Sequence, residues 1–174
     1  MTSFPAHLRS AATLIGLVVL MLAGVAWAWS AVTEPFPERE TAAVCADQVI
    51  AAGEKVYPDQ VTVSVLNAGG SEGLADRTMT ELVEGGLDRG EVGNAPADSE
   101  VNVAQIWAED LGNPAVQLVK AFLGRSAKVV ERDPPLPGVN VVVGEEFTGA
   151  TKGRQSVKAR QDATICSPTV DDPL

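Results

Sequence analysis

Residues 61–83 read VTVSVLNAGGSEGLADRTMTELV, and this stretch decides the fold expected for the chain around it. Valines at 61, 63 and 65 alternate with polar residues, which is typical of a half-buried strand. After a glycine-rich corner comes a helix pattern, with Ser71 as the expected N-cap and Gly85-Gly86 as the expected end. Glu72 and Asp76 lie near the positive end of its dipole. The apolar stripe predicted for this helix consists of Ala75, Met79, Leu82 and Val83.

The glycine-rich corner does not fit a phosphate-binding loop. A Walker-type loop needs G-x-x-x-x-G-K-[ST], whereas the nearest downstream cation here is Arg77 and Glu72 stands inside the corner. Two adjacent glycines also break the G-x-G-x-x-G dinucleotide fingerprint. We therefore predict a structural turn, in which an Asn side chain bonds turn amides and glycines allow positive φ. The residues predicted to build this turn are Asn67, Gly69, Gly70 and Gly73.

The remaining pattern predicts an α+β domain over 61–147. A second helix has Asn113 as its cap, Pro114 in its first turn and Gly124 at its end. Its predicted buried face consists of Ala115, Leu118, Val119 and Phe122. Further strands are predicted at 87–93, 101–108, 127–131 and 139–144. The order β-α-β-β-α-β-β suggests one mostly antiparallel sheet with both helices on one face.

The segments that flank this domain look less regular. Residues 32–60 form a polar, extracytoplasmic connector with several prolines, for which a short helix is expected around Ala42 to Lys55. Residues 148–174 are expected to form a tail. Neither segment shows an internal repeat or a low-complexity run, so the sequence predicts one folded domain with appendages.

The N-terminal region carries a long apolar run. From Ala11 to Trp29 nineteen residues contain no charge, which suits one membrane crossing. We predict a signal-anchor transmembrane helix at 11–31 that contacts the lipid bilayer; cleavage after the A-x-A sequence that ends at Ala28 is the alternative. A positive residue precedes the run and acids follow it, which predicts a single-pass cell-membrane protein. Residues 1–10 would then lie in the cytoplasm and the domain outside.

Charge excludes one class of partner and singles out one segment. The chain has a net charge of −10, and all 23 acidic residues follow residue 30. Such a surface repels nucleic acid at long range, so no nucleic-acid partner is expected. One stretch, TKGRQSVKARQ at 151–161, holds four cations and no acid. Either it is a solvated tail, or Lys152, Arg154, Lys158 and Arg160 contact an anionic surface, such as lipid or wall polymer.

Two cysteines, Cys45 and Cys166, flank the predicted domain on the predicted exterior. An oxidising compartment permits a disulfide, and two cysteines allow only one intramolecular pairing. We predict that they are joined; two free thiols, or a disulfide to another molecule, are the alternatives. No C-x-x-C spacing exists, so redox catalysis and a zinc site have little support.

The stretch from Val61 to Leu82 resembles the opening of the LytR C-terminal domain family: a valine-rich strand, Leu-Asn, a glycine turn, then Gly-Leu-Ala at a helix start. The resemblance continues at Gly93-Asn94-Ala95. It ends at 133–147, DPPLPGVNVVVGEEF, similar to the family's closing Asp-Pro, Leu-Pro-Gly, valine strand and Gly-x-[DE]-Phe. In relatives the third strand commonly ends in an aromatic and a Pro-Gly turn. Here Trp107 is followed by AEDLG, so no role of that loop is carried over.

The resemblance implies an accessory module of the cell envelope without a catalytic domain. In LytR-CpsA-Psr proteins the catalytic domain is separate and precedes this module, and the segment before residue 61 is too short to hold it. The single histidine, His7, precedes the apolar run, so no Ser-His-Asp or Cys-His arrangement can form outside. We therefore predict no enzyme activity, no catalytic residue, no metal and no cofactor.

Two functions from different classes fit these observations. The first is an interaction module that contacts wall polymer or wall-assembly proteins and supports envelope integrity. The alternative is a regulatory or sensor ectodomain that signals through its transmembrane helix. The first is favoured, because about ten residues inside the cell are too few for a signalling output without a partner.

Overall fold

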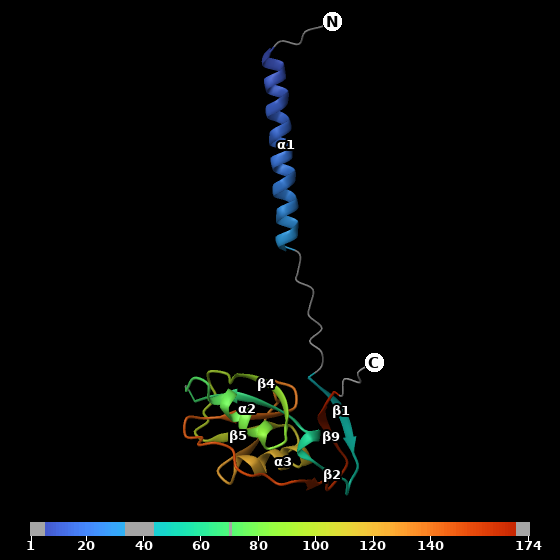
Figure 1. The fold of residues 1–174 in the computed structure, drawn as a ribbon, viewed down its shortest axis with the longest axis vertical. Helices are drawn as coiled ribbons and strands as arrows, with labels where there is room; N and C mark the ends of the chain where they lie inside the picture. Colours follow the sequence, from blue (N-terminus) through green and yellow to red (C-terminus); the bar gives the residue numbers. More distant parts are fainter. Residues whose placement is uncertain (1–5, 34–43, 70, 170–174) are drawn as a thin grey trace. The chain divides into compact units, whose positions relative to one another are not determined.

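The computed structural model describes residues 6–33, 44–69 and 71–169, in two compact units, Met1–Glu40 and Thr41–Leu174 (Figure 1). Each unit is described by itself. The second unit is wider than the predicted domain 61–147, because it also takes in segments expected as connector and tail.

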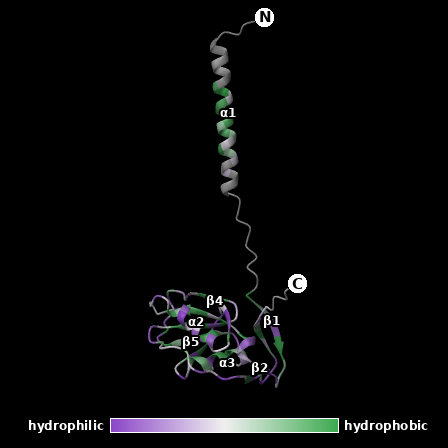
Figure 2. Ribbon diagram, viewed as in Figure 1, coloured by the Kyte–Doolittle hydropathy of each residue, from purple (hydrophilic) through white to green (hydrophobic). Residues whose placement is uncertain are grey.

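The first unit contains one helix, α1 (Ala6–Thr33), which includes the apolar run. Its described large hydrophobic side chains are exposed, for example Leu14, Val18 and Leu20, and Figure 2 shows hydrophobic residues along the helix. Over the described residues, no helix has the length and apolar content required of a membrane span. The transmembrane helix at 11–31 therefore stays a prediction.

A five-stranded mixed sheet forms the centre of the second unit. Its strands are β3 (Thr62–Asn67), β4 (Asp88–Asn94), β5 (Ala104–Ala108), β6 (Lys128–Glu131) and β7 (Val139–Val143), in the order β4-β3-β7-β5-β6. β3 is parallel to β4 and β7, and β5 is parallel to β6; only β5 and β7 are antiparallel. The α+β class is confirmed, but the prediction of a mostly antiparallel sheet is wrong. Each helix is a crossover between two neighbouring strands, and such a connection makes them parallel.

Two helices, α2 (Leu74–Glu84) and α3 (Pro114–Leu123), pack against one face of this sheet. The buried cluster on that face joins Met79 and Leu82 of α2 with Leu118 and Val119 of α3. It also contains alternate strand residues: Val63, Val65, Ile106, Val141 and Val143. The prediction that both helices cover one face is confirmed. A smaller cluster, Leu66, Val101, Trp107 and Val142, lies on the opposite face.

The helix ends agree with the sequence for α3 and differ for α2. The Asn113 side chain accepts a hydrogen bond from the Ala115 amide and Gly124 is the C-cap, as predicted. In α2 the N-cap is Gly73, at φ 76°, and not Ser71. Val83, predicted in the apolar stripe, is 37% exposed, whereas Leu74 and Thr78 are buried in its place. The corner continues two residues further than the Ser pattern suggested, so a different set of helix residues faces the core.

The flanking segments form two short antiparallel strand pairs. β1 (Cys45–Ile50) pairs with β9 (Ala163–Pro168), and β2 (Lys55–Val56) pairs with β8 (Val157–Lys158); the 3-10 turn η1 (Pro58–Gln60) follows β2. In Figure 1 β1 and β9 lie side by side. The helix expected around 42–55 is therefore wrong over its described residues. Its partner strand lies more than a hundred residues away, and this long-range pairing overrides a weak local helix preference.

Candidate functional site

The glycine corner that the sequence singled out is held by its own polar groups. The Asn67 side chain donates from Nδ2 to the Ser71 carbonyl at 2.8 Å, and its Oδ1 accepts from the Gly69 amide at 2.9 Å. A Cβ on Gly69 would collide with the backbone of Gly144 and Glu145. Gly73 takes a positive φ in open space. Gly70 lies outside the described residues. These contacts are those of a structural turn.

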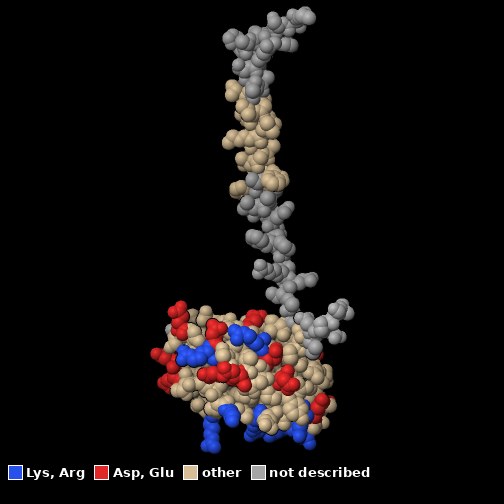
Figure 3. Space-filling view, viewed as in Figure 1, with Lys and Arg blue, Asp and Glu red and all other residues tan. Residues whose placement is uncertain are grey.

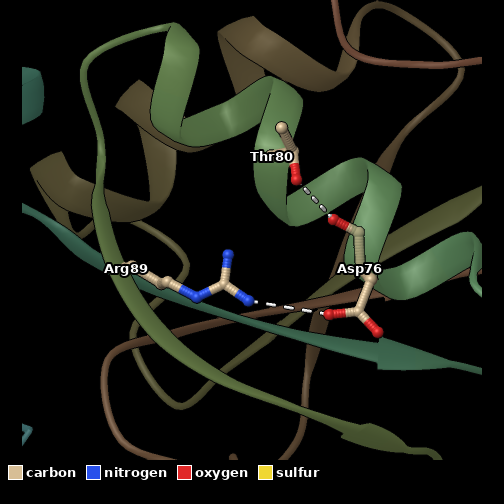
Figure 4. Close-up of polar contacts among 3 residues, drawn as sticks. All are labelled: Asp76, Thr80 and Arg89. Carbon is tan, nitrogen blue, oxygen red and sulfur yellow. Dashed lines mark hydrogen bonds and ion pairs between the residues drawn. The ribbon is translucent and has the colours of Figure 1, made fainter.

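The start of α2, which follows this corner, carries a carboxylate of its own. Asp76 lies in the first turn and forms an ion pair of 3.6 Å with Arg89 of β4, while the Thr80 hydroxyl donates to the Asp76 carbonyl (Figure 4). Among the described residues this is the one ion pair of the domain. Both partners are more than half exposed, so it contributes little to stability. The carboxylate occupies the position that a bound anion would take.

The predicted disulfide is present: Cys45 is bonded to Cys166, with their Cα atoms 5.4 Å apart. In the ladder of β1 and β9, Cys45 stands opposite Pro168 and Cys166 opposite Asp47, so the bond runs diagonally between neighbouring strands. It joins positions 121 residues apart in the sequence. The prediction of an intramolecular bond is therefore confirmed against free thiols and an intermolecular bond.

The basic stretch lies on an ordered segment, residues 148–160, which we call the strap. Its first part is tied to the helices: the Ala150 amide donates to Glu81 Oε2 of α2 at 2.6 Å, and the Thr151 amide donates to the Phe122 carbonyl of α3 at 2.6 Å. Its last part is tied to the β2 region, because the Ala159 amide donates to the Glu54 carbonyl at 2.8 Å. Ala159 itself is buried in the core. The backbone of 148–160 is therefore attached to the domain, while the side chains of its four cations are exposed to solvent, as expected for a solvated segment.

The strap presents its four cations to solvent, and the fold separates them into two sets. Arg154, Lys158 and Arg160 line an open groove of 990 Å³, which we call the basic groove. Its opposite wall includes Leu111 and Gln117. The described lining also includes Ala52, Gly53, Gly112, Pro114, Ser156, Val157 and Ala159, and contains no carboxylate.

Lys152 lies in a different hollow, of 660 Å³, which has two glutamates, Glu81 and Glu84, in its lining. Arg154 borders both hollows. None of the four cations has a carboxylate within ion-pair distance among the described residues. The structure thus separates Lys152 from the other three, which the sequence had grouped together.

A fifth cation, Lys55, joins this surface through strand pairing. In the β2–β8 ladder Lys55 stands directly opposite Lys158, an arrangement of like charges that is unfavourable by itself. Sequence reasoning missed Lys55 because it lies about a hundred residues before the strap, and only the strand register brings the two together. Figure 3 shows Lys and Arg gathered along one edge of the domain, while Asp and Glu prevail over the rest of the visible face.

The chemistry of this arrangement is that of non-covalent anion binding. Exposed guanidinium and ammonium groups without a carboxylate partner are donors for phosphate, sulfate or carboxylate oxygens. Within the described ranges, no group of three or more His, Cys, Asp or Glu side chains could hold a metal ion. The single His7 lies in α1, and its side chain is outside the description.

Comparison with known proteins finds a family model and a solved structure that resemble part of this chain. The family model described as LytR cell envelope-related transcriptional attenuator matches residues 60–147, from η1 to the residue just before the strap. No curated protein sequence matches the chain. One similar solved structure is the soluble domain of a conserved hypothetical secreted protein from Mycobacterium marinum. It is 24% identical, with a TM-score of 0.46, and the match covers 57% of this chain and 76% of that one.

Proposed function

The chain belongs to the LytR C-terminal domain family, and from this premise we propose that it is a membrane-tethered interaction module of the cell envelope. It contacts wall polymer or wall-assembly proteins outside the cytoplasm and thereby supports envelope integrity. The proposal assigns it a binding role and no catalytic step.

Support for the tether comes from the sequence of the first unit. The uncharged run 11–29 has the length of one membrane crossing, and the flanking charges favour a cytoplasmic N-terminus. The disulfide between Cys45 and Cys166 fits this orientation, because disulfides persist in oxidising compartments outside the cytoplasm. The domain that follows the tether would then face the cell wall.

The observation that carries the binding role is the set of unpaired cations on the strap. In a chain with a net charge of −10, the exposed cations Arg154, Lys158 and Arg160 lie within seven residues and line one groove, and none has a carboxylate partner among the described residues. Hydrogen bonds at Ala150, Thr151 and Ala159 hold the backbone that carries them. An ordered segment loses less conformational entropy when it binds than a free tail does, which favours a role in contact.

Crosslinking in intact cells, followed by mass spectrometry of partners and pelleting with purified wall sacculi, tests this function. We expect the full chain to pellet with sacculi or to crosslink to envelope proteins. Protease added to wall-stripped cells should digest the domain, since it would lie outside. Recovery of cytoplasmic regulators alone would support the sensor ectodomain, and protection from protease would overturn the tethered orientation.

A further inference from the structure

Resting on the proposed function, we propose that the basic groove binds a linear polymer that carries repeated oxyanion groups, phosphodiester or carboxylate. Arg154, Lys158 and Arg160 supply the charged contacts. Lys152, although it lies in the same basic stretch, does not take part.

The basic groove differs from the neighbouring hollow in having no carboxylate in its described lining. Lys152 lies in a hollow that has Glu81 and Glu84 in its lining. The described lining of the basic groove has no carboxylate at all. The charges of Lys158 and Arg160 therefore stay available to an external anion, whereas Arg154 borders both this groove and the hollow that holds the two glutamates.

The second observation is a like-charge pair that involves Lys158, which lines the groove, and Lys55, which lies beside the groove lining on the paired strand. Lys55 and Lys158 face each other across β2 and β8, and both are exposed. Like charges directly opposite in a strand pair reduce stability, and among the described residues neither lysine forms an ion pair with an acid. A bound oxyanion that contacts both ammonium groups would offset that repulsion. Binding of the ligand and folding of this strand pair would then stabilise each other.

The third step concerns the shape of the ligand. A groove of 990 Å³, open to solvent and lined by three cations of one segment, is larger than a single phosphate or sulfate needs. Ser156 and Gln117 add neutral polar groups to the lining, although the Gln117 Nε2 already donates to the Leu111 carbonyl at 2.7 Å. This combination fits an extended chain in which anionic groups alternate with hydroxyl-bearing units. A bilayer surface, being flat, would contact protruding cations and not a hollow.

The test measures binding of two polyanions to the full chain in nanodiscs of neutral phosphatidylcholine. The probes are long-chain polyphosphate, which carries phosphate groups, and polygalacturonate, which carries carboxylates; the stronger of the two identifies the oxyanion. We expect Lys158→Gln combined with Arg160→Gln to weaken binding by about 10-fold, and added salt to weaken it further.

The matched control is Lys152→Gln combined with Arg125→Gln, which removes the same net charge but leaves the groove intact. We expect this variant to bind within about twofold of the wild type, because exposed charges outside the site act only through screened long-range attraction. An equal loss of binding in both double variants would overturn the site. The site would also be overturned if neither of the two polyanions bound. Unfolding temperatures of the variants show whether each remains folded.

A membrane contact is the competing outcome, and a labelling arm detects it. Modification of Lys158 by an amine-reactive reagent is compared between neutral nanodiscs and nanodiscs that contain phosphatidylglycerol. If the polyanion protects Lys158 from modification in both kinds of nanodisc, the proposal is supported. If only phosphatidylglycerol protects Lys158, the proposal is overturned and the bilayer is the partner. If the groove variant still pellets with sacculi as the wild type does, the groove assignment fails while the proposed function stands.

Discussion

The glycine corner and the strap are both polar segments that follow a buried strand, yet their polar groups are used differently. In the corner, Asn67 bonds the Gly69 amide and the Ser71 carbonyl, so its donors and acceptors are satisfied within the turn. In the strap, backbone groups are satisfied in the same way by Glu54, Glu81 and Phe122, but the cationic side chains are left without a carboxylate among the described residues.

This difference separates a structural role from a binding role more clearly than sequence pattern does. The corner looked like a ligand loop because strand, glycines and helix follow one another, but its Asn67 side chain is bonded to the turn itself. The strap looked like a solvated tail because it is short, basic and close to the C-terminus. Exposed charge held on an ordered backbone is what a partner can recognise, and the strap offers several cations of this kind.

The largest expected effect comes from removing the disulfide with Cys45→Ser and Cys166→Ser. Because the bond closes a loop of 121 residues, the free energy of unfolding should fall by about 3–5 kcal/mol in urea titrations. Amide hydrogen exchange should rise more in β1, β9 and the strap than in the corner, since these segments are joined through the bond. Equal deprotection of the corner would mean that the two regions are not separate.

An intermediate effect is expected for Gly69→Ala in the corner. The added Cβ meets the backbone of Gly144 and Glu145, which cannot move aside as a flexible side chain would, so unfolding should become easier by about 2–3 kcal/mol. Gly73→Asn is the matched control, because that glycine has positive φ but open space and Asn tolerates this conformation; its cost should be about 1 kcal/mol or less. Polyanion binding should be unchanged in both variants. A loss of binding in Gly69→Ala while it remains folded would contradict the division between the regions.

The smallest change in the free energy of unfolding is expected for Lys158→Glu, which should stabilise the domain instead of destabilising it. The substitution converts the like-charge pair of Lys158 and Lys55 into an opposite-charge pair. This change should raise the free energy of unfolding by about 0.5 kcal/mol. The same change should abolish polyanion binding, because it introduces a carboxylate into the basic groove. Lys152→Glu serves as the control and should retain binding. A substitution in the strap that lowers both stability and binding would indicate a structural role for Lys158.

Much of the second unit could be predicted from local signals. The strands at β3, β4 and β7, the cap of α3 at Asn113 and its end at Gly124 follow from alternation, capping and breaker residues, which act within a few positions. The disulfide could be predicted because two cysteines allow a single intramolecular pairing. The predicted cap at Ser71 was wrong, because the chain turns once more at Gly73, at φ 76°, before the helix begins.

The sequence by itself determined the family, the α+β class, the acidic charge and the four cations of the strap, since each is a property of composition or of residues close together. Only the tertiary structure decided the parallel neighbours of β3, the strand pairs that replace a predicted helix and tail, and the basic groove itself. The physical reason is sequence distance. Lys55 stands opposite Lys158, and Gln117 and Arg160 line one groove, only after strands and loops far apart in the chain have come together.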